Sequence, residues 1–237
     1  MVLRKKRYGS PTIFHVTSRG MRLSPIFHQE KDYLKFITIL DNTYNYSPYN
    51  LYAYCLMKNH YHLLIGLKEI PLLKIMHSIN GAYASFFNKT YNLQEQPFQN
   101  RYTAHPVPTD YALMTVSAYI HNNPRVAKMT TDPVTYQWSS YPYYCTPDLI
   151  AEPASHPLFQ PDVITQNKLF TNQPHTSKWS TLTQSPISPR SPPEAFTREK
   201  IRQLFPTPLH HYYPRFVDRE WTLHNLQKTK SYNKLEE

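Results

Sequence analysis

Four short segments of this chain have the hydrophobic pattern of β-strands. Side chains on a strand point alternately to opposite faces, so a strand with one buried face alternates hydrophobic and polar residues. In the first segment, for example, His15 and Thr17 share one face. The predicted strands cover residues 11–18, 51–57, 60–67 and 97–105. Only Lys58-Asn59 separates the second strand from the third, which predicts a tight hairpin.

Between and after these strands, hydrophobic residues recur at steps of three and four, the spacing of one helix face. The predicted helices cover residues 29–45, 71–88 and 109–122. Thr109-Asp110 is expected to cap the last helix, and Pro124 to end it. The order strand, helix, strand, strand, helix, strand predicts an α+β fold with a ferredoxin-like antiparallel sheet, helices on one face and one extra helix.

Beyond residue 146 this periodicity gives way to a proline-rich sequence. The run from Gln184 to Pro193 is typical of an extended linker, and residues 194–205 show the spacing of a short helix. The basic and aromatic run from His210 to Phe216 is compatible with DNA contact or with packing against the core. We therefore predict a folded domain over residues 1–146 and a proline-rich extension over residues 147–237, with few core contacts between them.

The overall charge favours an anionic partner. The 237 residues carry a formal net charge of +10, which is most simply explained by nucleic acid binding. No hydrophobic stretch approaches the ~18 residues that span a bilayer, so no membrane association is expected. Cys55 and Cys145 are the two cysteines; they lie far apart in the sequence, and reduced thiols in a cytoplasmic protein are expected. Four scattered glycines exclude a glycine-rich nucleotide-binding loop.

The first candidate for chemistry is His60-Tyr61-His62. On a strand the two histidines point to one face and Tyr61 to the other. Two adjacent imidazoles can bind a divalent metal ion and leave its remaining positions open. A half-buried strand with two hydrogen-bonded histidines would show the same pattern, and the motif alone leaves both interpretations open.

The second candidate is the pair Tyr119 and Asn123 near the end of the predicted helix. Residues four apart share one helix face. A tyrosine hydroxyl can act as a nucleophile towards an electrophile that a metal ion has polarised. The amide oxygen of asparagine suits Mg²⁺ or Mn²⁺ better than Zn²⁺. A tyrosine that merely packs in the core would fit the same spacing.

Several further segments accompany these two motifs. The accompanying residues are Phe14–Gly20, Ile26-Phe27, Ala53–Ile65, Tyr83, Phe87-Asn88, Pro97–Tyr102, Tyr119–Pro124 and Gln137–Tyr141. Together they resemble the HUH-type single-tyrosine transposases, and within them the REP-associated tyrosine transposases, over about residues 8–145. Lys58 stands where that family usually has proline, and Arg125 where it usually has valine. The extra charge of Lys58 would lower the affinity for a metal ion beside it.

The resemblance implies a function for residues 1–146 as an HUH transposase and nuclease domain. Such a protein cuts and rejoins single-stranded DNA near a hairpin through a covalent 5′-phosphotyrosine. Tyr119 would be the nucleophile, and His60, His62 and Asn123 would hold Mg²⁺ or Mn²⁺. The sequence is compatible with a monomer or a homodimer. It is also compatible with two other functions: an inactive or domesticated protein that binds DNA hairpins, and a ferredoxin-like RNA-binding protein. The glycine-aromatic run of an RNA-recognition module is absent.

Basic residues other than the proposed metal ligands and nucleophile are candidates to hold the DNA backbone. The predicted DNA-binding residues are Arg19, Arg101, Lys58 and the basic arm Arg4, Lys5, Lys6 and Arg7.

Overall fold

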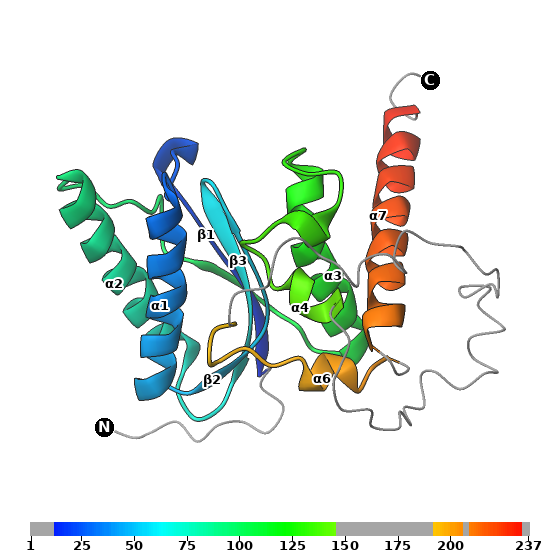
Figure 1. Cartoon of the computed structure of the whole chain (residues 1–237), viewed down its shortest axis with the longest axis horizontal. Helices are drawn as coiled ribbons and strands as arrows, with labels where there is room; N and C mark the ends of the chain where they lie inside the picture. The colour runs from blue at the N-terminus through cyan, green and yellow to red at the C-terminus, as the bar shows by residue number, and fades with distance from the viewer. Residues whose placement is uncertain (1–11, 146–191, 206–208, 234–237) are drawn as a thin grey trace. The chain divides into compact units, whose positions relative to one another are not determined.

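A computed structural model describes residues 12–145, 192–205 and 209–233, with side chains as far as residue 225 (Figure 1). The described residues form two compact units. The first unit ends at Ser117 and includes Pro193–Thr197; the second begins at Ala118 and includes the chain from Arg198 on. The predicted division after residue 146 falls outside the described residues and stays a prediction.

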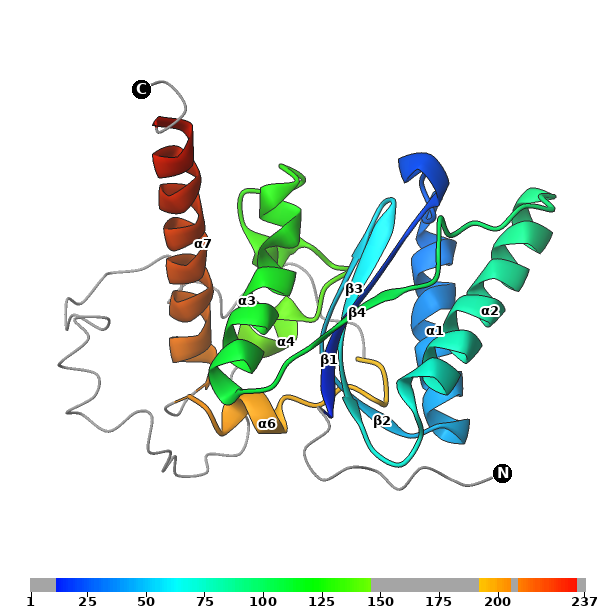
Figure 2. The ribbon, with the colours of Figure 1, turned by 180° about the vertical axis from the view of Figure 1, so that it is seen from behind.

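The first unit is built on a four-stranded antiparallel sheet. Its strands are β1 (Ile13–Arg19), β2 (Tyr49–Met57), β3 (His60–Leu67) and β4 (Thr103–Pro106), in the order β2-β3-β1-β4. The helices α1 (Glu30–Tyr46) and α2 (Leu72–Tyr91) cover one face, and Figure 2 shows β4 beside β1. This order confirms the predicted ferredoxin-like arrangement. A 3₁₀ turn, Met21–Leu23, follows β1.

Aromatic side chains fill the space between this sheet and its two helices. The Phe36 ring on α1 lies 4.8 Å from the ring of Tyr61 on β3 and 5.1 Å from that of Tyr83 on α2. The Tyr61 hydroxyl also donates a hydrogen bond of 2.5 Å to Asn80 of α2. Tyr61 therefore faces the core, and its neighbours along β3 face the other side of the sheet.

The fourth strand is shorter than predicted. Regular pairing is confined to Thr103–Pro106, while Phe98 makes only an isolated bridge to Gly20. Pro97 has no amide hydrogen to donate to a strand ladder. Phe98 is buried, but the residues between it and Thr103 do not pair as a strand. The predicted strand over 97–105 is therefore correct only at its end.

The second unit is helical. It contains the end of α3 (Asp110–Val126), the 3₁₀ turn η2 (Pro133–Thr135), α4 (Tyr141–Cys145), α6 (Glu199–Arg202) and α7 (Leu209–Asn233). Its core is a cluster of rings, in which Tyr213 of α7 stacks on Tyr144 of α4 with centroids 4.5 Å apart. Among the described residues, no helix is both long and apolar enough to cross a membrane.

Helix α3 begins as predicted and ends later than predicted. The amide of Ala112 donates to the Thr109 hydroxyl, which is the expected N-terminal cap. At the other end the helix continues through Pro124, which cannot donate to the Ile120 carbonyl. The side-chain amide of Asn123 donates instead to the carbonyls of Tyr119 (2.9 Å) and Ile120 (3.4 Å). The longer of these bonds gives the Ile120 carbonyl a donor that Pro124 cannot supply.

The helix ends in a Schellman motif. Lys128 adopts the left-handed conformation with φ 56°, which a residue other than glycine rarely takes. The amide of Met129 bonds to the Pro124 carbonyl at 2.9 Å, and that of Lys128 to the Arg125 carbonyl at 3.0 Å. Both bonds satisfy carbonyls that the last turn of a helix otherwise leaves without donors.

The extension makes more contacts than predicted. The amide of Leu51 on β2 donates to the Ala195 carbonyl at 2.7 Å, and that of Thr197 to the Leu51 carbonyl at 3.0 Å. The short helix predicted over 194–205 is reduced to Glu199–Arg202, because residues 195–197 instead pair with the edge of the sheet. The expectation of few core contacts was therefore wrong.

The run from His210 to Phe216, for which two interpretations were open, lies in α7. Tyr213 and Phe216 are buried there. Of the predicted linker, residues 184–191 lie outside the described residues.

Candidate active site

The two predicted metal-binding histidines lie on one face of the central strand β3. In the antiparallel pairing, His62 stands opposite Thr17 of β1 and His60 stands opposite Arg19. Tyr61, between them, packs on the helices at the other face. The His60 and His62 ring centroids are 5.0 Å apart, with an interplanar angle of 81°. The strand geometry predicted from the sequence is therefore confirmed, and both imidazoles point away from the helix-covered core.

A third histidine joins this pair. His15 of β1 approaches His62, with 2.9 Å between its Nε2 atom and the His62 Nδ1 atom. Their rings stack with centroids 5.2 Å apart. A hydrogen bond to the second nitrogen of a ligand histidine holds its ring in one orientation. The alternating pattern predicts that His15 lies on a strand but does not predict this contact, because the residue-by-residue pairing of β1 with β3 cannot be read from local sequence.

The hydrogen bonds indicate which imidazole nitrogens would bind a metal ion. The Asn59 side-chain oxygen lies 2.7 Å from Nδ1 of His60. That oxygen can only accept, so Nδ1 of His60 carries the hydrogen and Nε2 is the basic nitrogen of the neutral ring. In His62 the Nδ1 atom is engaged with His15, so Nε2 would be the ligand atom there too.

Burial keeps these imidazoles uncharged. It lowers the pKa of His60 to about 4, and the positive charge of Arg19 adds to this effect. The pKa of His15 is lowered to about 4, first by burial and then by the nearby His105. Burial, followed by the charges of His15, His60 and Arg19, places the pKa of His62 well below its usual range. Neutral imidazole is the form that coordinates metal ions.

The donor set fits a divalent ion if oxygen ligands complete it. Among the described residues, no three His, Cys, Asp or Glu side chains are placed to hold a metal ion. The histidine pair would therefore need ligands of another type, such as an amide oxygen, a DNA phosphate or water. Imidazole nitrogen with hard oxygen ligands suits Mn²⁺, and Mg²⁺ when oxygen ligands dominate.

Tyr119 and Asn123 lie one turn apart on α3, in the second unit. Tyr119 is 46% exposed, whereas its neighbours Ala118 and Ile120 are buried. It is therefore not a core tyrosine, unlike Tyr213. The Asn123 side chain is largely buried, and its Nδ2 atom donates to the Tyr119 carbonyl. The Nδ2 atom is thus hydrogen-bonded to the helix backbone. The amide oxygen Oδ1 is the atom of this side chain that could bind a metal ion.

Three of the predicted DNA-binding residues are exposed. Arg19 stands opposite His60 across the β1–β3 pair, and Lys58 lies in the hairpin turn just before His60. Arg101 is exposed in the segment before β4. The arm formed by Arg4, Lys5, Lys6 and Arg7 lies outside the described residues. Arg19 and Lys58 therefore bring positive charge to the histidine end of β3.

A close backbone approach holds this end of the sheet together. The amide of Gly20 donates to the Asn59 carbonyl at 2.8 Å, and the amide of Ile26 donates to the Lys58 carbonyl at 2.9 Å. A Cβ atom on Gly20 would lie 2.0 Å from the Ser24 carbonyl oxygen. Only glycine fits there without moving the backbone that supports the hairpin.

The residues of this site lie in a part of the chain that is similar to known transposases. Residues 11–123 match the family described as "Transposase IS200 like". No curated protein matches the chain. The structure is similar to that of a REP-associated tyrosine transposase bound to a REP hairpin, with a TM-score of 0.50 and 15% sequence identity, over 60% of this chain and 84% of that chain.

A second solved structure, from Deinococcus radiodurans R1 and named as a candidate transposase, is 16% identical. It matches 51% of this chain and 97% of its own, with a TM-score of 0.37. The family match contains the histidine pair, Tyr119 and Asn123. Residues 11–123 are therefore similar to IS200-like transposases, and the fold is similar to that of a REP-associated tyrosine transposase.

Proposed function

We propose that the protein cuts single-stranded DNA near a hairpin and joins the cut end to another strand through a covalent bond to Tyr119. The observation that carries this proposal is the exposure of Tyr119, one turn before Asn123, within a transposase-family match. A buried tyrosine could not reach a phosphodiester, whereas an exposed one can.

The reaction conserves phosphodiester bonds. The Tyr119 oxygen attacks phosphorus in line and loses its proton to water, while the bond from phosphorus to the 3′ oxygen breaks. The departing oxygen takes up a proton and becomes a free 3′-hydroxyl, and the 5′-phosphate stays on the tyrosine. A 3′-hydroxyl of another strand can reverse this step, so rejoining needs no ATP.

His60 and His62, through Nε2, and Asn123, through Oδ1, would hold the Mg²⁺ or Mn²⁺ ion. When bound, such an ion polarises a phosphate oxygen and offsets the negative charge of the transition state. The low pKa values of the histidines favour this role, because no proton has to leave the imidazoles at neutral pH. His15 would keep the His62 ring in its orientation.

The DNA partner is proposed from charge and from the structural relative. Arg19, Lys58 and Arg101, with the basic arm at residues 4–7, would contact phosphates, and binding should weaken as salt rises. The relative with a TM-score of 0.50 is bound to a REP hairpin. We therefore expect this protein to bind hairpins with single-stranded flanks.

The test is incubation of the full-length protein with a library of single-stranded hairpin DNAs and Mn²⁺ or Mg²⁺. We expect a protein–DNA adduct that survives denaturation, and peptide mapping should place the DNA on Tyr119. Chelation of the metal ion should abolish the adduct. Tight hairpin binding without any adduct, in both metals, would instead identify an inactive hairpin-binding protein.

A further inference from the structure

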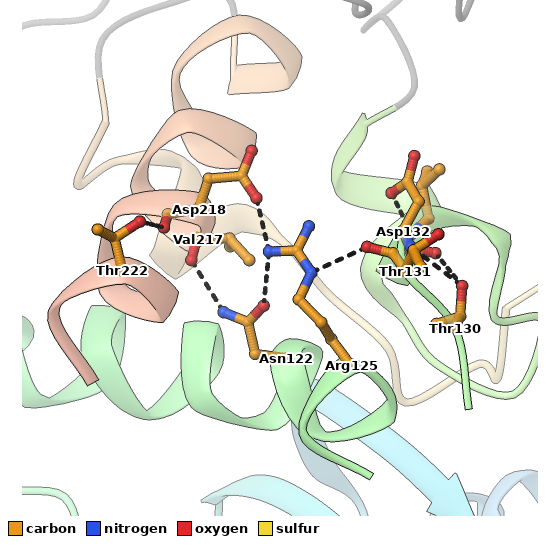
Figure 3. A network of polar contacts seen from close by, with 9 residues as sticks. Asn122, Arg125, Thr130, Thr131, Asp132, Val217, Asp218 and Thr222 are labelled. Atoms are coloured by element: carbon orange, nitrogen blue, oxygen red, sulfur yellow. Dashed lines mark hydrogen bonds and ion pairs between the residues drawn. The ribbon is translucent and has the colours of Figure 1, made fainter. Parts of the chain in front are cut away.

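The last turns of α3 are attached to α7 by a polar network (Figure 3). Nη1 of Arg125 lies 2.8 Å from Oδ1 of Asp218 on α7, and Nε donates to the Thr131 carbonyl at 3.1 Å. The guanidinium also lies 5.5 Å from the centroid of the Trp221 ring, a distance suited to a cation–π contact. The Arg125 side chain is 15% exposed, so water screens the ion pair only in part.

Two neighbouring residues of α3 make further contacts in the same unit. Nδ2 of Asn122 donates to the Val217 carbonyl of α7 at 2.8 Å. The two ring nitrogens of His121 lie 2.7 Å from the Tyr213 hydroxyl of α7 and 2.8 Å from the Ser140 hydroxyl. Asn122 and His121 are buried, so the loss of either partner would leave a polar group without its bond.

These contacts occupy a different face of α3 from the chemistry. His121, Asn122 and Arg125 follow the i, i+1, i+4 spacing of one helix face, whereas Tyr119 and Asn123 share another. The network can therefore determine how α3 is rotated about its axis without covering the tyrosine.

This part of α3 has particular need of outside support. Pro124 removes one backbone hydrogen bond from the last turns, and Lys128 holds the left-handed position of the cap. A helix end with a missing bond and a strained cap frays readily unless packing holds it. Arg125 and Asp218 supply such packing. Asp218 lies far beyond residues 11–123, which the family match covers.

We propose that α7 is a positioning element for Tyr119, acting through Arg125 and Asn122, which fix the rotation of the last turns of α3. The catalytic consequence rests on the proposed function, because it assumes that Tyr119 attacks the phosphodiester. In-line attack depends on placement within about 1 Å, and a misplacement of that size can cost about 100-fold in rate. Arg125 and Asp218 are thus positioning residues, which act on Tyr119 through the rotation of α3.

The test compares Asp218→Ala with a matched control, Arg202→Gln. The control breaks another arginine–carboxylate pair of the same unit, Arg202 with Glu199 at 3.0 Å within α6. Both variants are made in the full-length protein. Melting temperature serves as the check on folding.

The first measurement is the ¹⁹F NMR spectrum of 3-fluorotyrosine incorporated at position 119 alone. We expect Asp218→Ala to shift or broaden this line, and Arg202→Gln to leave it unchanged. The exchanged pair Arg125→Asp with Asp218→Arg should recover part of the narrow line. This readout does not depend on whether Tyr119 is a nucleophile.

The second measurement is the single-turnover rate of adduct formation with hairpin DNA. Asp218→Ala should lower it about 10- to 100-fold with the Kd for DNA unchanged within about twofold. The exchanged pair should restore part of the rate, which a merely destabilised protein would not do. An unchanged ¹⁹F line and rate in Asp218→Ala would overturn the positioning role. So would equal effects of Asp218→Ala and Arg202→Gln.

A wild-type protein that forms no adduct, while Asp218→Ala still perturbs the ¹⁹F line, would refute the proposed function and retain the positioning role.

Discussion

The histidines and the tyrosine of the candidate site are supported in different ways. His60 and His62 lie on β3, which has a hydrogen-bonded neighbour on each side and an aromatic core behind it. Tyr119 lies on a helix whose end contains Pro124 and a strained cap. The strand is held mainly by the surrounding sheet, whereas the helix end depends on Asp218 and Val217 of α7.

This difference indicates where each group of candidate residues is vulnerable. Backbone ladders hold the histidine strand, so single side-chain changes there should affect metal binding more than the fold. The tyrosine is held by a few polar contacts to a distant part of the chain, so remote changes should affect its placement.

Tyr119→Phe should lower the rate of adduct formation by more than about 10³-fold and leave hairpin affinity nearly unchanged, because only the attacking hydroxyl is lost. The measurement is a denaturing gel beside a binding titration. Tyr111→Phe is the matched control, since Tyr111 is also exposed on α3 and should retain full activity. Full cleavage by Tyr119→Phe would move the nucleophile to another tyrosine.

Replacing His60 and His62 together by Ala should eliminate metal-dependent cleavage and leave the sheet folded. The two rings share the face opposite the aromatic core, so their loss removes the ligands and leaves that core intact. Manganese titration calorimetry and thermal melting are measured side by side. His105→Ala is the control, because His105 is exposed on β4 and lies opposite His15. Unchanged manganese binding would refute the ligand role.

The helical unit should lose stability in acid through His121. Burial lowers the pKa of His121 to about 3 from an ordinary value of 6.5. Between these two values the unfolded chain binds the proton and the folded protein does not, so the free energy of unfolding falls as pH decreases from 6.5 towards 3.

Urea denaturation at pH 7 and pH 4 measures this loss. His121→Gln should remove up to about 3 kcal/mol of the difference between the two pH values, since glutamine does not titrate there. The comparison uses the pH dependence of each protein and not its absolute stability. An equal pH dependence of the two proteins would contradict the assignment.

Lys128→Gly should stabilise the end of α3 by about 0.5–1 kcal/mol, because glycine adopts φ 56° without strain. Denaturant unfolding gives the free energy. Lys128→Ala is the control, since alanine retains the strained backbone and should give no such gain. A gain from Lys128→Ala equal to that from Lys128→Gly would show that the lysine side chain, and not the backbone, was responsible.

Local patterns in the sequence determined much of this protein. Alternation along residues 60–67 predicted β3 and the shared face of His60 and His62, and the spacing of Thr109 from the following residues predicted the cap of α3. Such features depend only on the two-residue period of a strand or the 3.6-residue period of a helix. They can therefore be read without knowing which segments meet.

The tertiary structure alone decided which distant residues meet. The contact of His15 with His62 follows from the pairing of β1 with β3, and the ion pair of Arg125 with Asp218 joins residues 93 positions apart. Helix α3 continues through Pro124, where the side chain of Asn123 donates to the Tyr119 and Ile120 carbonyls. Packing between segments that are remote in sequence selects such contacts, because many pairings satisfy the same local pattern and only one buries the shared core.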